Sequence, residues 1–113
     1  MNQKFREQSR HPLGTPLPVM VYYRNQKSND VKSVEAMLLD VSEEGLGILV
    51  MEQVPLASRC SVELYDDENA RYVEGDCCYL TETEYGLRLG VKLDKEARGD
   101  VLDYLDSLQT QLK

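Results

Sequence analysis

The sequence predicts a mainly β protein, a six-stranded antiparallel β-barrel with a C-terminal α-helix. Short segments of alternating apolar and polar residues recur at close spacing along most of the chain. The connections between them are rich in Asp, Asn, Ser and Gly, which favour turns. After Leu93 the apolar residues instead recur every three or four positions, as in a helix. Six strands and one amphipathic helix bury their apolar faces together when the sheet closes and the helix covers one opening.

The first part of the chain holds an arm and three expected strands. Prolines and a glycine at positions 12 to 18 exclude a helix and predict a flexible N-terminal arm over 1–16. The barrel domain with its helix then covers 17–113. Val19, Val21 and Tyr23 share one face of the first strand. The expected elements are strands at 17–24, 34–39 and 46–51, with turns at 25–30 and 40–45.

The second part holds three further strands. Cys60, Val62 and Leu64 alternate with polar residues, which is the pattern of a half-buried strand. The clearest alternation comes last, where Tyr85, Leu87, Leu89, Val91 and Leu93 are separated by Gly, Arg and Lys. The expected elements are strands at 60–65, 71–80 and 85–93, a connection at 54–57 and a hairpin loop at 66–69.

An amphipathic helix is expected at 95–111. Asp94 is its candidate N-cap, and Gly99 weakens the first turn by up to ~1 kcal/mol. One apolar stripe would cover the barrel opening. Its members are Val101, Leu102, Leu105, Leu108 and Leu112.

Length and charge limit the classes of function. The 113 residues suffice for one domain, and the net charge is −7. Basic residues outnumber acidic ones only up to Val34, whereas the rest is strongly acidic. This profile argues against DNA or RNA as a partner and suits a small anionic ligand near the N-terminal part. No apolar run approaches the roughly 20 residues of a membrane helix, and no secretory signal is present. A cytoplasmic protein without membrane insertion is expected.

The chemistry-bearing residues do not assemble into a catalytic or metal pattern. Cys60, Cys77 and Cys78 have neither disulfide nor zinc spacing, and we expect them to be reduced. His11 is the only histidine, and no nucleophile turn or phosphate-binding loop occurs. We therefore expect no enzyme, no metal and no cofactor.

Two short motifs remain. Arg6 and Arg10 stand four residues apart in a segment without apolar partners, and arginine can grip a phosphate or the edge of guanine. Asp40, Ser42 and Gly45 form an Asp-x-Ser-x-x-Gly turn. The carboxylate can accept from guanine N–H groups, the hydroxyl can donate to phosphate, and glycine allows a left-handed turn. Taken singly, the motifs also fit a solvated arginine pair and an ordinary capped turn.

Together, Arg-x-x-x-Arg before the first strand and Asp-x-Ser-x-x-Gly between the second and third resemble the PilZ domain family. The resemblance extends to Leu89-Gly90-Val91 in the last strand and to the terminal helix. Members with both motifs bind cyclic di-GMP, a bacterial second messenger. The resemblance implies ligand contacts from Arg6, Arg10, Asp40, Ser42 and Gly45, with Lys4 and Arg88 as candidate additional contacts.

The implied function is a receptor in which the arginine arm becomes ordered over the ligand. With no output domain in the sequence, we expect the signal to pass to an unidentified partner protein, in a process such as motility or biofilm regulation. The sequence has no tryptophan, and no further base-stacking residue is predicted. The alternative is a PilZ-like adaptor for pilus assembly or motility that binds no nucleotide, although such domains typically lack the two motifs.

Overall fold

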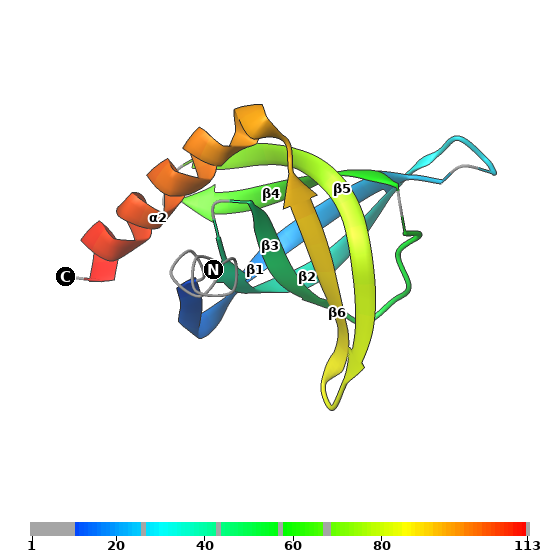
Figure 1. The fold of residues 1–113 in the computed structure, drawn as a ribbon, viewed down its shortest axis with the longest axis horizontal. Helices are drawn as coiled ribbons and strands as arrows, with labels where there is room; N and C mark the ends of the chain where they lie inside the picture. Colours follow the sequence, from blue (N-terminus) through cyan, green and yellow to red (C-terminus); the bar gives the residue numbers. More distant parts are fainter. Residues whose placement is uncertain (1–10, 26, 43, 57, 67–68, 113) are drawn as a thin grey trace, which may run out of the picture.

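Six antiparallel strands close into a barrel in the order β1-β2-β3-β6-β5-β4 (Figure 1). The structure is a computed structural model that describes residues 11–25, 27–42, 44–56, 58–66 and 69–112. A short 3₁₀ helix and one α-helix follow the last strand, so the predicted fold is confirmed. The elements are β1 (His11–Arg24), β2 (Val31–Val41), β3 (Gly45–Val50), β4 (Arg59–Asp66), β5 (Asn69–Thr83), β6 (Gly86–Leu93), η1 (Lys95–Ala97) and α2 (Arg98–Leu112).

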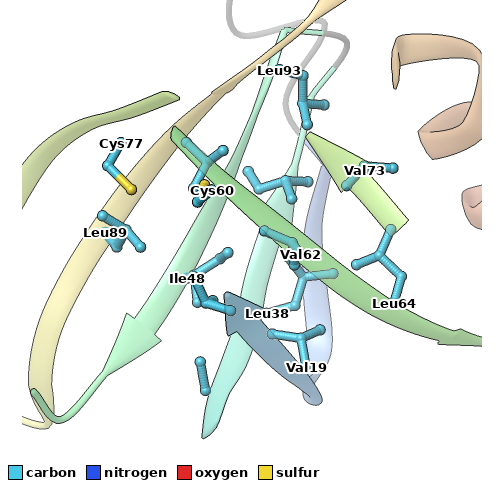
Figure 2. Packing of buried hydrophobic residues seen from close by; sticks show 14 of the residues in the cluster. Val19, Leu38, Ile48, Cys60, Val62, Leu64, Val73, Cys77, Leu89 and Leu93 are labelled. Atoms are coloured by element: carbon cyan, nitrogen blue, oxygen red, sulfur yellow. The ribbon is translucent and has the colours of Figure 1, made fainter. Parts of the chain in front are cut away.

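The core fills the barrel interior because alternate side chains of every strand point inward. Val19 and Val21 of β1 are buried, as are Val62 and Leu64 of β4, and side chains from all six strands meet there (Figure 2). Each fully buried aliphatic side chain contributes roughly 1.5–3 kcal/mol relative to an exposed one. The expected inward faces of the first and fourth strands are therefore confirmed.

The cysteines divide between the two faces of the barrel wall. Cys60 and Cys77 are buried in the core near each other (Figure 2), whereas Cys78 is exposed, and all three are free thiols. A hydrogen bond with Cys77, together with burial, raises the pKa of Cys60. Free thiols agree with the sequence expectation.

The first strand begins earlier than expected, at His11 instead of Leu17. Pairing between β1 and β4 covers only Met20 to Tyr23, whereas β1 pairs with β2 along nearly its whole length. The prolines at 12, 16 and 18 therefore lie where β1 is an edge strand, and a missing N–H there breaks no ladder with β4. Tyr85 also differs from expectation, because it lies in the turn before β6 and is exposed.

The helix covers one end of the barrel, as expected, but with a different set of side chains. Ala97, Val101 and Tyr104 join the core, whereas Leu102 is 43% exposed, so its placement in the buried stripe was wrong. The side chains of Leu105, Leu108 and Leu112 lie outside the described parts of the structure. Figure 1 shows α2 at the same end as the start of β1 and the β2–β3 turn.

Asp94 holds the N-cap position of η1 but makes no capping hydrogen bond with its side chain. Its carboxylate instead receives two hydrogen bonds from Arg59 of β4, at 2.8 and 2.5 Å. These bonds lower the pKa of Asp94. The capping prediction is therefore corrected: Asp94 joins the start of the helix to the barrel wall.

Candidate ligand-binding site

A β-bulge in β2 turns Asp40 to the outside of the barrel. Val34, Ala36 and Leu38 point inward, so regular alternation would also send Asp40 into the core. The pairing with β3 shifts register between Leu38 and Asp40, which restores the inward face one residue later, at Val41. Bulges re-aim side chains in this way. Asp40 thus lies within β2 and not in the following turn, where the sequence had placed it.

A second bulge does the same for Tyr79 in β5. The register with β6 shifts between Cys77 and Tyr79, with Cys78 as the extra residue. Cys77 is buried and Leu80 packs against the core, whereas Tyr79 between them is 40% exposed. The two adjacent cysteines therefore mark the place where the inward–outward alternation of β5 shifts by one residue.

The two re-aimed side chains stand at the ends of one row across four strands. Asp40 pairs with Gly47, Gly47 with Gly90, and Gly90 with Tyr79. The two glycines leave room for their neighbours. A Cβ on Gly90 would collide with the Tyr79 ring, which therefore lies against the backbone of β6. The barrel wall between Asp40 and Tyr79 thus carries no side chain of its own.

Arg88 of β6 reaches across Gly47 and binds Asp40. Its Nη2 donates to Asp40 Oδ2 at 2.6 Å, and both side chains are mostly buried. A Cβ on Gly47 would occupy the space that this pair uses. Burial disfavours the charged guanidinium, but hydrogen bonding with Asp40 and Tyr79 outweighs it and raises the pKa of Arg88. The site therefore holds a fixed positive charge beside the carboxylate.

The Ser42–Gly45 turn closes on itself next to this pair. The Ser42 N–H donates to the Gly45 carbonyl at 2.9 Å, and the Gly45 N–H donates to Ser42 Oγ at 3.1 Å. The hydroxyl also donates to the Gly45 carbonyl oxygen at 3.3 Å, so Ser42 holds the turn closed as both donor and acceptor. Gly45 does not have a positive φ, so the left-handed turn predicted for it is wrong. Its missing side chain serves close approach, because a Cβ would lie 2.5 Å from the Val91 carbonyl oxygen.

These residues line one open cavity of about 360 Å³, within the size range of small-ligand sites. Asp40, Ser42 and Gly45, the predicted contacts of the second motif, form one wall. Tyr79 and Lys92, which sequence reasoning missed, form another. Only the strand register could have revealed them, since Lys92 pairs with Gly45 and Tyr79 with Gly90.

The chain enters the barrel beside this cavity. His11 pairs with Val41 and Pro12 with Asp40, so the backbone of β1 starts next to the Asp-x-Ser-x-x-Gly motif. The predicted contacts Lys4, Arg6 and Arg10 precede this point and lie outside the described residues. The register requires only that the segment bearing them joins β1 at the edge of the site.

Two further features, a metal-ligating cluster and a membrane-spanning helix, can be judged within the described ranges. No group of three or more metal-ligating side chains is found there. None of the helices described is long and apolar enough to cross a bilayer.

A known class of small domains shares this closed barrel with a terminal helix. The PilZ domain family model matches residues 4–107, so the chain belongs to the PilZ domain family. Nine chains of known structure match. One is the PilZ domain of YcgR from Escherichia coli with c-di-GMP, with 14% identity, a TM-score of 0.61, and coverage of 92% of this chain and 89% of that one. No curated protein sequence matches.

Proposed function

We propose that this protein is a receptor for cyclic di-GMP that acts by binding and not by catalysis. The observation that carries the proposal is the register of β1, because the segment with the arginine motif joins the barrel directly beside Asp40 and Val41. Both signature motifs of the family can therefore act on one ligand. Family membership and the c-di-GMP held by the YcgR domain support the same ligand.

The described residues suit a guanine nucleotide with phosphodiester groups. The Asp40 carboxylate, held outward by the bulge and by Arg88, accepts from the N1–H and N2–H₂ of guanine. The exposed ring of Tyr79 offers a surface on which the base stacks, which is worth about 1–3 kcal/mol. Ser42 donates to a phosphate once its hydroxyl turns away from the Gly45 carbonyl, and Lys92 attracts the phosphate.

Arg6 and Arg10 complete the proposed site from the N-terminal arm. Ordering the arm costs roughly 1–2 kcal/mol per residue. Charge-assisted bonds of about 1.5–3 kcal/mol each, from two guanidinium groups to phosphate and guanine, oppose that cost. We infer that the arm orders on binding and that the ordered surface passes the signal to a partner protein.

Calorimetric titration with cyclic di-GMP tests the ligand and the arginines. Wild type should bind, whereas Arg6→Ala and Arg10→Ala should lose binding while melting at the wild-type temperature, since neither belongs to the described core. Arg24→Ala is the matched control, because Arg24 lies at the far end of β1 and bonds the Asn29 carbonyl. Equal affinity in all four proteins would refute the arginine roles, and no binding by wild type would favour the nucleotide-free adaptor.

The base contacts are tested by comparing ligands. Cyclic di-AMP lacks the guanine N1–H and N2–H₂ donors, so wild type should bind it far more weakly. Asp40→Asn should reduce this preference. Tyr79→Phe should keep affinity and Tyr79→Ala should lose it, because stacking needs the ring and not the hydroxyl. A Tyr79→Ala variant that binds as tightly as wild type would exclude stacking at this position.

A further inference from the structure

The outer face of β1 and β2 carries an apolar depression edged by carboxylates. It consists of two open grooves, of about 250 and 430 Å³, that share Met20, Glu35 and Met51. We name it the methionine groove and define it by Met20, Glu35, Met37, Leu49, Met51 and Glu52.

The strand register explains why these residues meet. Met20 of β1 pairs with Glu35 of β2, and Met37 of β2 pairs with Leu49 of β3. All four alternate with inward-facing neighbours and so point outward. Met51 follows β3 and is 70% exposed. Methionine side chains are flexible and polarizable, so they adapt to the shape of a bound partner.

The charge around the groove is negative. Its charged lining residues are Glu35 and Glu52, and no lysine or arginine lines it among the described residues. Glu63, which pairs with Met20 across β1 and β4, adds a third carboxylate. Hydrogen bonds from Tyr72, Tyr22 and Tyr65 lower the pKa of Glu63, so this carboxyl is ionised at neutral pH.

The apolar floor and the carboxylates at the edge together determine which kind of partner can bind in the groove. Nucleic acids and anionic membranes are repelled by the carboxylates. A second copy of this chain brings a net charge of −7 against the same negative surface. A segment with lysine or arginine fits, because the aliphatic stems of these residues pack on methionine while their cationic ends reach Glu35 and Glu52.

We propose that the methionine groove binds a positively charged amphipathic segment of a partner protein. The interaction needs no nucleotide, so it stands apart from the ligand-binding proposal. The groove nevertheless adjoins the ligand site, since Leu49 pairs with Arg88, which holds Asp40.

Methyl NMR on protein labelled at methionine tests the proposal without any nucleotide. The probe is a model amphipathic helix of leucine and lysine, about 18 residues long. Three of the four methionines belong to the groove, so their methyl signals should shift on titration. A scrambled peptide of the same composition should bind about tenfold more weakly or worse. If no groove methionine shifts, or if the scrambled peptide binds equally well, the proposal is wrong.

Charge-matched variants locate the contact. Glu35→Lys with Glu52→Lys should weaken peptide binding at least about tenfold. Glu96→Lys with Asp103→Lys changes the net charge equally but lies on the exposed surface of η1 and α2, and it should weaken binding less than about twofold. Equal losses in both pairs would show attraction to net charge alone and would overturn the proposal. Met51→Ser, a change at an exposed side chain, tests the apolar floor if the first pair folds poorly.

Discussion

Gly47 is the residue whose absent side chain matters most in the candidate site. Asp40 and Arg88 meet where its Cβ would lie, so the ion pair can form only across a glycine. The carboxylate is thereby held in place before any ligand arrives. An acceptor fixed in advance has less conformational freedom to lose when it binds guanine.

Gly47→Ala should therefore act through the ion pair. We expect the new methyl group to displace Arg88 from Asp40 and to lower the free energy of unfolding by about 1.5–3 kcal/mol, the value of a charge-assisted bond. Arg88→Met, which keeps an apolar stem, should cost a similar amount. The double variant should lose much less than the sum, because only one interaction is removed. Urea unfolding of the three proteins measures this coupling.

Gly99→Ala is the control for this series. A Cβ added at Gly99 would meet no atom within 4 Å beyond the neighbouring helical backbone. The same change in α2 should therefore stabilise the helix by up to ~1 kcal/mol. Additive losses for Gly47→Ala and Arg88→Met would show that the glycine is needed for another reason.

At the scale of single residues, sequence reasoning could group only residues that one short motif contains. Asp40, Ser42 and Gly45 could be predicted because they are adjacent in the chain, and they line one cavity. That Arg88 binds Asp40 could not be worked out, since 48 residues separate them and only the β2–β3–β6 register joins them. Tyr79 was missed because a bulge decides which way it points.

Two strands contribute to the candidate site through a break in their alternation. Without the bulges in β2 and β5, Asp40 and Tyr79 would point into the core. A two-residue period in the sequence locates a strand but does not reveal a one-residue slip within it. This is why the second strand was predicted to end at 39, whereas β2 continues to Val41.

Deleting single residues from β2 tests the role of its bulge. Removal of Leu39, the extra residue, should leave Leu38 inward, Asp40 outward and Val41 inward, so the barrel should fold. Removal of Glu35, in the regular part, should force Val34 or Ala36 to the wrong face. We expect a clearly lower melting temperature for the second deletion than for the first, measured by circular dichroism. Equal melting temperatures would mean that Leu39 does not set the phase of the strand.

Over the whole molecule, the change of period after Leu93 made the fold predictable, because it separates a β-rich chain from one amphipathic helix. The order of strands around the barrel needed the structure, since β1 meets β4 and β3 meets β6 across long stretches of chain. In space the charges do not follow the division along the chain, because the bases at the candidate site come from its acidic part. Arg88 and Lys92 lie on β6 at the candidate ligand site, whereas the methionine groove carries only carboxylates.

The helix covers one end of the barrel that the strands close, and Tyr104 is its largest fully buried side chain. The sequence favoured Leu102, because a stripe of leucines is the stronger apolar signal. The direction in which α2 leaves the barrel instead turns Val101 and Tyr104 to the core. Arg59 fixes that direction by bonding Asp94, just before the helical segment starts.

Tyr104→Ala should therefore lower the free energy of unfolding by about 3–5 kcal/mol, as expected for an aromatic side chain removed from a core. Leu102→Ala is the matched control, because Leu102 lies two residues before Tyr104 on the same helix and is 43% exposed. It should cost less than about 1 kcal/mol. Urea denaturation of both variants measures the difference. A larger loss for Leu102→Ala would restore the leucine stripe as the buried face and would require the helix to be rotated about its axis.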